Sequence, residues 1–217
     1  MIKVISVFGT RPDTIKMAPL VALLDKDESF EHIVCVTGQH REMVKQILEV
    51  FDINPKYDLD IMKQGQSLDY VTSAILVRFS EVLDIEKPDM ILVHGDTNTC
   101  LSASIAAFYK KIPIGHVEAG LRTEDIFSPY PEEFCRRTVD SIATLYFAPT
   151  KSNANNLINE KIDTDRIFIT GNTVIDTLKT TVKENYIFNE PMLNDIDYKN
   201  KKVIPITAHR RENIGVN

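Results

Sequence analysis

The sequence predicts an α/β protein built on a doubly wound parallel sheet. Short runs rich in β-branched residues alternate with longer helical patterns along the whole chain. Several of these runs, such as Met90–His94, are almost continuously apolar, as expected of strands that helices cover on both faces. Regular alternation of this kind is typical of βαβ units, in which a helix joins two parallel strands.

The predicted strands are Ile2–Phe8, His32–Thr37, Met90–His94, Pro113–Val117, Thr144–Ala148, Ile167–Thr170 and Lys202–Thr207. The predicted helices are Pro12–Asp25, Arg41–Phe51, Leu68–Glu86, Thr97–Lys110, Pro131–Ile142, Lys151–Glu160 and Thr173–Glu184. Pro12 suits a first helical turn, whereas Pro19 predicts a kink or a restart inside the first helix. Asp96 or Thr97 can cap the helix that follows it. The stretch Asp52–Ser67 reads as a long irregular connection.

Composition limits the class of protein. A chain of 217 residues with 43% hydrophobic and 26% charged residues is typical of a soluble globular protein of one or two domains. The net charge of −6 argues against a general nucleic-acid binder. Cys35 and Cys100 lie in apolar segments and read as buried free thiols, so without a disulfide framework the cytoplasm is the expected compartment. No apolar stretch approaches the roughly 20 residues of a membrane span.

The domain organisation is predicted from a change in composition near the end of the chain. The segment Asn185–Lys201 is locally polar and has no clean period. We therefore expect residues 1–185 to form a Rossmann-like domain. Residues 186–217 are expected to be an interdomain crossing followed by the first strand of an incomplete second domain.

Three carboxylates are predicted at the edge of the sheet where open parallel sheets bind ligands, outside the carboxyl ends of the strands. Asp96 and Glu118 directly follow apolar runs, and Glu132 opens a predicted helix soon afterwards. Helix capping explains Asp96 about equally well, and the helix dipole explains one of Glu132 and Glu133. Glu118 is harder to explain structurally, because the small residues Ala119–Gly120 beside it leave room for a ligand.

Basic groups are predicted at the same edge. Arg11 lies in a turn between a strand and a helix, where the helix amino end favours phosphate, although a tight turn with a solvated arginine is an equal alternative. Lys16 either reaches the same anion or faces water. The basic turn His209–Arg211 suits a diphosphate, with a solvated turn as the alternative. His94 and His116 read as satisfied core or cleft histidines rather than catalytic ones, and no ligand spacing indicates a metal site.

Several ordered motifs are familiar: Phe8–Pro12 with Ile15–Leu20, Gln39–Met43, His94–Thr97, Gly115–Thr123, Pro131–Glu133, Thr170–Asp176 and His209–Glu212. Over essentially its whole length the chain resembles the non-hydrolysing UDP-N-acetylglucosamine 2-epimerase family. The resemblance implies a GT-B-like fold with the active site between two Rossmann-like domains. It also implies interconversion of UDP-N-acetylglucosamine and UDP-N-acetylmannosamine for surface polysaccharides, by elimination and re-addition of UDP with exchange of the C2 proton. Neither a cofactor nor a metal is implied.

The resemblance also assigns roles to residues. The catalytic positions are Asp96, Glu118, Glu132 and His209, and the substrate-binding positions are Arg11, Lys16, Arg136 and Arg210. Gln39 and His40 match the region where such bacterial enzymes bind a second UDP-N-acetylglucosamine as an activator. A homodimer through the first domain is expected.

The chain departs from the family pattern in three places. Asp13 replaces the usual glutamate, Cys135 replaces an asparagine beside Arg136, and the second domain is expected to be missing from these 217 residues. Three alternatives therefore stay open: an inactive truncated fragment, a subunit completed by a separate C-terminal half, and a non-catalytic nucleotide-sugar-binding module. A relative that hydrolyses the substrate, or a GT-B glycosyltransferase, would share the fold.

Overall fold

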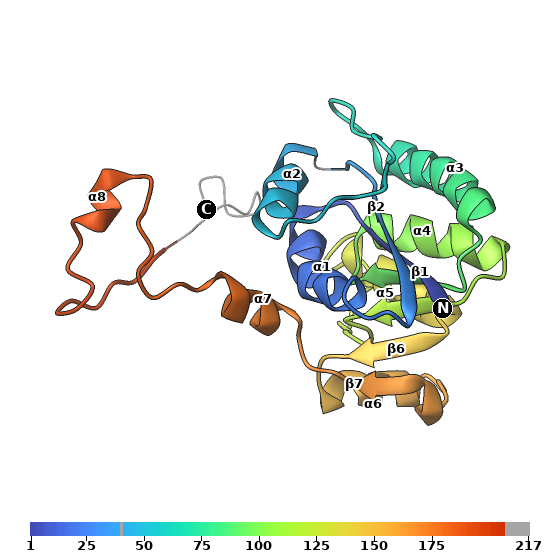
Figure 1. Cartoon of the computed structure of the whole chain (residues 1–217). Coiled ribbons are helices and arrows are strands. Elements are labelled where there is room, and N and C mark those ends of the chain that lie inside the picture. The colour runs from blue at the N-terminus through green and yellow to red at the C-terminus, as the bar shows by residue number, and fades with distance from the viewer. Residues whose placement is uncertain (40, 207–217) are drawn as a thin grey trace. The chain divides into compact units, whose positions relative to one another are not determined.

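The computed structural model describes residues 1–39 and 41–206, and its main feature is a parallel sheet flanked by helices (Figure 1). The strands are β1 (Ile2–Phe8), β2 (Phe30–Val36), β3 (Tyr57–Asp58), β4 (Met90–His94), β5 (Ile114–Val117), β6 (Leu145–Ala148) and β7 (Ile167–Ile169). The helices are α1 (Arg11–Leu24), α2 (Arg41–Val50), α3 (Leu68–Glu86), α4 (Asn98–Tyr109), α5 (Glu132–Ile142), α6 (Lys151–Asn159), α7 (Val174–Thr181) and α8 (Pro191–Asn194), with a 3-10 turn at Thr164–Arg166.

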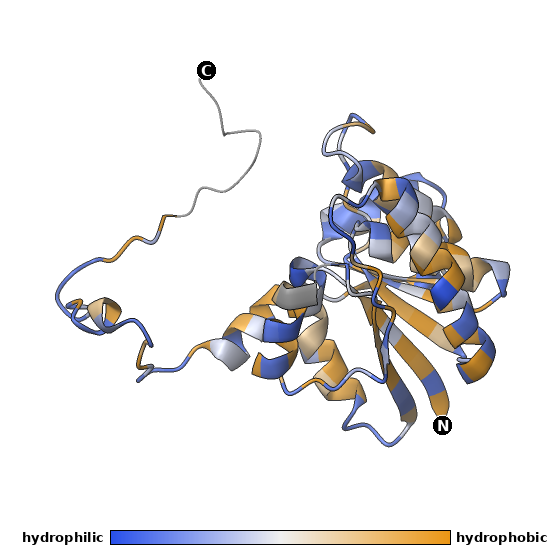
Figure 2. Cartoon of the chain, turned by 90° about the horizontal axis from the view of Figure 1, so that it is seen from above, coloured by the Kyte–Doolittle hydropathy of each residue, from blue (hydrophilic) through white to orange (hydrophobic). Residues whose placement is uncertain are grey.

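Two hydrophobic cores lie on opposite faces of the sheet because successive strand residues point to opposite sides. In β1, Ile5 and Val7 pack into the core formed with α3, α4, α5 and α6, whereas Val4 and Phe8 pack into the core formed with α1 and α2. The strands are apolar along most of their length (Figure 2). This two-sided burial explains why the strand sequences show continuous apolar runs.

The strand order is β3-β2-β1-β4-β5-β6-β7, and every pairing is parallel. From β1 the chain builds the sheet first toward β3 and then, after α3, from β4 toward β7. The order therefore reverses between β1 and β4. Ligands of doubly wound sheets bind at this switch point, outside the carboxyl ends of the strands.

Most predicted elements are confirmed, with shifts of a few residues at their ends. Helix α1 continues through Pro19, so the predicted restart is wrong. The connection Asp52–Ser67 contributes the two-residue edge strand β3, which was not predicted. The strand predicted at Lys202–Thr207 is wrong over its described part, residues 202–206, which are exposed and form no strand. A strand needs neighbours to satisfy its backbone groups, and these residues have none within the described part of the chain.

By its internal contacts the chain divides into two units, Met1–Thr181 and Val182–Asn217. The sheet and helices α1–α7 belong to the first unit, and α8 belongs to the second. The assignment of residues 186–217 as an interdomain crossing stays a prediction.

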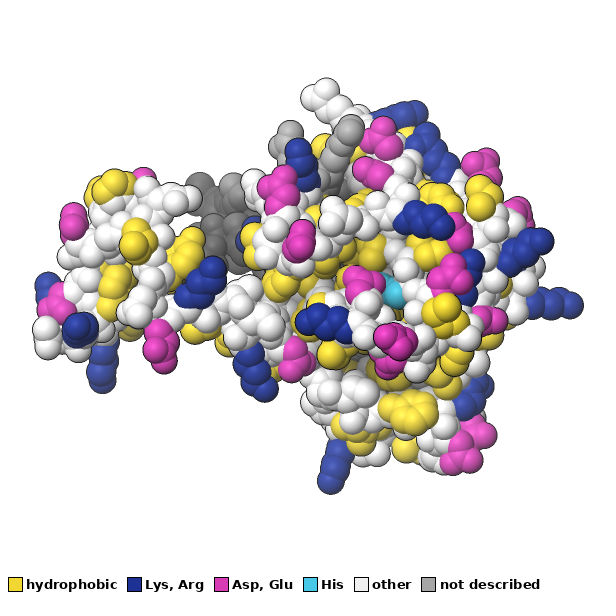
Figure 3. All heavy atoms as spheres, viewed as in Figure 1, with side chains coloured by type: hydrophobic (Ala, Val, Ile, Leu, Met, Phe, Trp, Pro, Cys, Tyr) yellow, Lys and Arg dark blue, Asp and Glu magenta, His cyan; other side chains and the backbone are white. Residues whose placement is uncertain are grey.

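The surface of the chain carries charges of both signs. In the view of Figure 3, acidic and basic side chains are intermingled rather than separated into large patches. No helix in the described ranges 1–39 and 41–206 is long and apolar enough to cross a membrane.

Candidate active site

The carboxyl ends of β1, β4 and β5 bring three short segments to one edge of the sheet. They are the turn Gly9–Thr10 (between β1 and Arg11, the first residue of α1), the turn Gly95–Asp96 after β4, and Glu118 after β5. Because β1, β4 and β5 are neighbours, these segments lie side by side although the sequence separates them widely. Helix α5 begins with Glu132 and packs against β5 and α4.

Glu118 is held by two partners. The Lys16 Nζ lies 2.7 Å from Oε1 and 2.6 Å from Oε2 of Glu118, and the Asn172 Nδ2 donates to Oε2 at 3.1 Å. Glu118 also has a φ of 67°. A non-glycine residue rarely adopts this left-handed conformation, which is concentrated at active sites and ligand-binding turns. Lys16 therefore does not simply face water. Its ammonium already balances the charge of Glu118, so an anionic ligand would share Lys16 with that carboxylate.

Asp96 does not cap helix α4. Thr97 is the N-cap residue, and its Oγ1 accepts from the Cys100 N–H at 3.1 Å. Asp96 is instead free to pair with Arg136, whose Nη2 lies 2.8 Å from Asp96 Oδ2. Burial raises the pKa of Asp96 above its ordinary value, and the nearby Glu118 and Glu132 add to that effect against Arg136 and Lys16. The three predicted carboxylates therefore share one electrostatic environment.

The two glutamates that open α5 have different environments. Glu133 is fully buried and accepts from the Thr123 N–H at 3.1 Å and from Arg137 Nε at 2.5 Å. Burial alone would raise the pKa of Glu133, but the hydrogen bonds from Arg137 and Thr123 hold that pKa below its ordinary value. The buried Oε2 of Glu132 has no hydrogen-bond partner among the described residues. Glu133 is therefore the structural acid, and Glu132 keeps an unused acceptor.

His94 is buried beside Glu118, but among the described residues its side chain is not fully satisfied, as the sequence suggested it would be. Its Nε2 lies 3.8 Å from Glu118 Oε2 and has no hydrogen-bond partner in the described part of the chain. Burial, together with the positive charges of Lys16 and His116, places the pKa of His94 well below its ordinary value. The imidazole is therefore neutral at pH 7.

The Asp13 side chain stabilises the turn after β1 by hydrogen bonds to its backbone. The buried Asp13 carboxylate accepts from the Thr10 N–H at 2.8 Å and from the Gly9 N–H at 3.2 Å. Burial raises the pKa of Asp13 to about 6, although these backbone hydrogen bonds oppose the shift. Arg11 is exposed at the start of α1 and has no hydrogen bond or ion pair to any described residue. It is available to an anion at the amino end of α1.

The Gln39 side chain is tied to the same edge of the sheet. Its Oε1 accepts from Thr99 Oγ1 at 2.8 Å, and its backbone carbonyl accepts from Gln66 Nε2 at 3.2 Å. His40, His209 and Arg210, which also have predicted roles, lie outside the described residues.

The structure adds a residue to which sequence reasoning gave no role. Asn172 lies in the segment Thr170–Asp176, which carried part of the family resemblance, and it contacts Glu118 directly. Its position shortly after β7, at the carboxyl edge of the sheet, is the signal that could have identified it.

A family profile described as UDP-N-acetylglucosamine 2-epimerase matches residues 22–217. A curated UDP-N-acetylglucosamine 2-epimerase from Yersinia pestis is 50% identical over 226 aligned positions, which cover 98% of this chain and 58% of the relative.

Solved structures agree with this relationship. A Staphylococcus aureus structure with UDP superposes with a TM-score of 0.90 at 51% identity, over 99% of this chain and 56% of that one. The UDP-GlcNAc 2-epimerase from Neisseria meningitidis, bound to UDP-GlcNAc, gives a TM-score of 0.80 at 52% identity, over 82% of this chain and 48% of that one. A lipopolysaccharide outer core galactosyltransferase shares the fold alone, at 13% identity and a TM-score of 0.57.

The chain spans about half the length of the relatives it matches. Its Rossmann-like sheet corresponds to half of the GT-B-like fold of these relatives. Because the family profile matches residues 22–217, the chain belongs to the UDP-N-acetylglucosamine 2-epimerase family.

Proposed function

We propose that this chain forms one wall of the active site of a UDP-N-acetylglucosamine 2-epimerase, which interconverts UDP-N-acetylglucosamine and UDP-N-acetylmannosamine for surface polysaccharide synthesis. The observation that supports this most is the gathering of Asp96, Glu118 and Glu132 with Lys16 and Arg136 at one sheet edge. Arg11 adds an unpaired positive charge at the same edge.

The chemistry requires both charge types. In the proposed reaction, the proton on C2 passes to a base while the bond between C1 and the diphosphate oxygen breaks, which leaves an enol ether and UDP. UDP then adds back to C1 while an acid returns a proton to the opposite face of C2. The Arg11 and Lys16 cations would stabilise the departing diphosphate, whose negative charge increases as it leaves.

The carboxylates would carry the proton. A group that takes or gives a proton works best when its pKa lies near the working pH. The raised pKa of Asp96 suits this task, and Glu132 offers a buried oxygen without a partner. Glu118 would contact the reacting part of the ligand once the diphosphate competes for Lys16.

His209 and Arg210 remain proposed as catalytic and substrate-binding residues, and Gln39 and His40 as part of an activator site. Because the relatives are longer than this chain, we propose that the opposite wall of the site comes from sequence outside these 217 residues. A homodimer stays part of the proposal.

The test is incubation with UDP-N-acetylglucosamine in D₂O while NMR follows the C2 proton. Two proteins are compared: the 217-residue chain, and a chimera in which the C-terminal part of the Staphylococcus relative follows residue 217. Exchange of the C2 proton with formation of UDP-N-acetylmannosamine supports the proposal, and Glu118→Gln should abolish it. A folded chimera that binds the sugar nucleotide without exchange would favour the non-catalytic binding module.

A further inference from the structure

His116 is a fully buried residue of β5 whose two ring nitrogens both face hydrogen-bond acceptors. Its Nδ1 lies 2.6 Å from Asp140 Oδ1, and its Nε2 lies 2.7 Å from the backbone carbonyl oxygen of Gly95. A carbonyl oxygen and a carboxylate accept hydrogen bonds but donate none. Both ring nitrogens therefore need a hydrogen, and an imidazole that carries two is positively charged.

The surroundings of His116 provide the negative charge that this state requires. Asp140 also accepts from Arg122, whose Nη1 lies 2.8 Å from Oδ2, and Arg122 in turn pairs with Glu160 at 2.6 Å. The four side chains together are neutral when all are ionised, so no net charge is buried. Burial alone would lower the pKa of His116, but Asp140 and the Gly95 carbonyl raise it. His116 and Arg122 correspondingly hold the pKa of Asp140 below its ordinary value despite burial.

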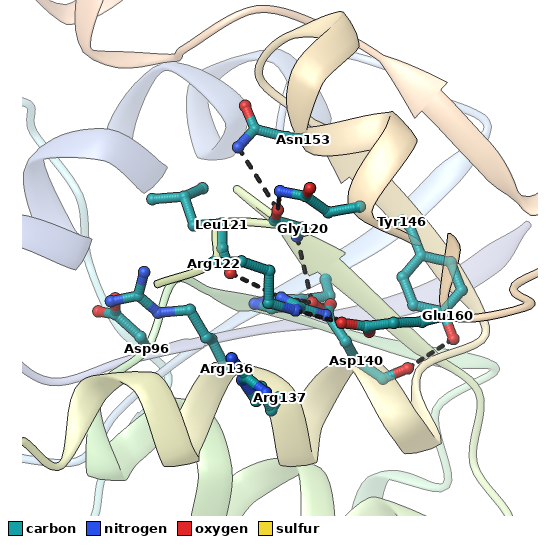
Figure 4. Close-up of polar contacts among 12 residues, drawn as sticks. Asp96, Gly120, Leu121, Arg122, Arg136, Arg137, Asp140, Tyr146, Asn153 and Glu160 are labelled. Atoms are coloured by element: carbon teal, nitrogen blue, oxygen red, sulfur yellow. Dashed lines mark hydrogen bonds and ion pairs between the residues drawn. The ribbon is translucent and has the colours of Figure 1, made fainter. Parts of the chain in front are cut away.

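The four side chains His116, Asp140, Arg122 and Glu160 form a network that contacts both turns carrying the proposed acids. His116 donates a hydrogen bond to the backbone carbonyl of Gly95, the neighbour of Asp96. Through Asp140 Oδ2 it accepts the Gly120 N–H at 3.1 Å, two residues beyond Glu118. Figure 4 shows the Gly120 amide directed at Asp140, with Asp96 and Arg136 beside this cluster.

The other charged groups near His116 agree with an imidazolium. Asp96 contributes to raising its pKa from the turn after β4. His94, on the neighbouring strand β4, has its own pKa lowered in part by His116. One charged and one neutral histidine on adjacent strands is the arrangement expected when only one has a carboxylate partner within hydrogen-bond distance.

We propose that His116 is an imidazolium at neutral pH and that it acts with Asp140 as a pair of positioning residues, which hold the Gly95–Asp96 turn and the segment after Glu118 in a fixed relation to each other. Neither residue needs to touch the ligand. The assignment of a positioning role rests on the proposed function of Asp96 and Glu118, whereas the protonation state of His116 does not.

The protonation state is measured directly by NMR of the chain labelled with 15N-histidine. The sequence has 5 histidines, and the His116 signals are assigned by their absence in His116→Gln. An imidazolium gives two ring nitrogens with similar shifts, whereas a neutral ring gives two widely separated ones. We expect the imidazolium pattern at pH 7, because a hydrogen-bond acceptor faces each ring nitrogen of His116. A neutral pattern for His116 at pH 7 in the folded chain would overturn the proposal.

The positioning role is tested with Asp140→Asn. An amide cannot balance the imidazolium, so we expect a neutral His116 and shifted amide signals at Gly95 and Gly120. Asp84→Asn is the matched control, because it removes an exposed carboxylate that pairs with Lys110. A folded Asp140→Asn protein with unchanged Gly95 and Gly120 signals would contradict the role.

In the chimera, Asp140→Asn should lower kcat for C2 exchange on the order of 10²-fold, as expected from a displacement of about 1 Å, with a much smaller change in KM. An unchanged kcat would also refute the role. If the unsubstituted chimera shows no exchange, the proposed function fails while the nitrogen shifts still decide the state of His116. The wild-type spectrum decides that state even if Asp140→Asn does not fold.

Discussion

Lys16 and Glu118 form an ion pair across 102 positions of sequence, with Nζ at 2.7 Å and 2.6 Å from the two carboxylate oxygens. One residue lies on the helix after β1 and the other on the turn after β5. The pair couples the proposed diphosphate site to a proposed acid, because a ligand anion near Lys16 competes with Glu118 for the same ammonium.

Lys16→Met should destabilise the chain, because it leaves the Glu118 carboxylate largely buried without its counter-charge. The Glu118 side chain is only 11% exposed. We expect a loss of about 1–3 kcal/mol in the free energy of unfolding, measured by urea denaturation at pH 7. Lys45→Met is the control, since Lys45 is 75% exposed and its pair with Glu49 is worth less than about 0.5 kcal/mol. Equal losses in the two variants would contradict the importance of the pair.

Glu132→Gln and Glu133→Gln should separate function from stability. Glu133 accepts charged and backbone hydrogen bonds while fully buried, so Glu133→Gln should cost about 2–4 kcal/mol of unfolding free energy. Glu132→Gln should change stability by less than about 1 kcal/mol, because its buried oxygen has no partner to lose. In the chimera, Glu132→Gln should abolish C2 exchange. The reverse pattern in urea denaturation would show that the two roles are exchanged.

Asp13 should make the chain less stable as the pH rises. Its pKa is about 6 in the folded chain against 3.8 for an unperturbed aspartate, so the folded state holds the proton more tightly. The contribution of Asp13 to stability is then greatest below about pH 4, falls by about 3 kcal/mol as the pH rises to about 6, and is constant above that. Other carboxylates titrate in the same range, so the measurement compares the chain with Asp13→Asn between pH 4 and pH 7. Parallel stability curves for the two proteins would contradict the prediction.

Gly9→Ala should disturb the turn that presents Arg11. A β-carbon on Gly9 would lie 1.7 Å from Thr37 Oγ1 and 2.9 Å from Thr99 Oγ1. We expect a loss of about 1–3 kcal/mol from overpacking, measured by thermal and urea unfolding. Thr37→Ala removes the nearest atom, so the double variant should recover part of the loss, with a coupling of about 1 kcal/mol. Additive losses in the double variant would show that the clash is relieved elsewhere.

Much of the site was predictable because parallel strands end at a common edge. Asp96 and Glu118 each follow an apolar run, and that position alone was enough to predict that they lie together. Local pattern could not decide which residue caps α4. Both Asp96 and Thr97 are good caps, and in the structure Thr97 caps α4 while Asp96 pairs with the Arg136 side chain from α5. The strand predicted at Lys202–Thr207 is wrong because an apolar run forms a strand only where neighbouring strands pair with it.

The sequence by itself determined the order of helices α1–α7 and of every strand except β3, together with the parallel sheet and the family. These depend on apolar periodicity, on turn residues and on ordered motifs, all of which are local in the chain. Only the tertiary structure decided that Lys16 pairs with Glu118, that Glu133 rather than Glu132 is the satisfied acid, and that His116 lies between two acceptors. These contacts join segments 4 to 102 residues apart, and the longer ones exist only after both cores have packed against the sheet. The charge state of a buried side chain depends on which partners lie within about 3 Å, and periodicity carries no information on that distance.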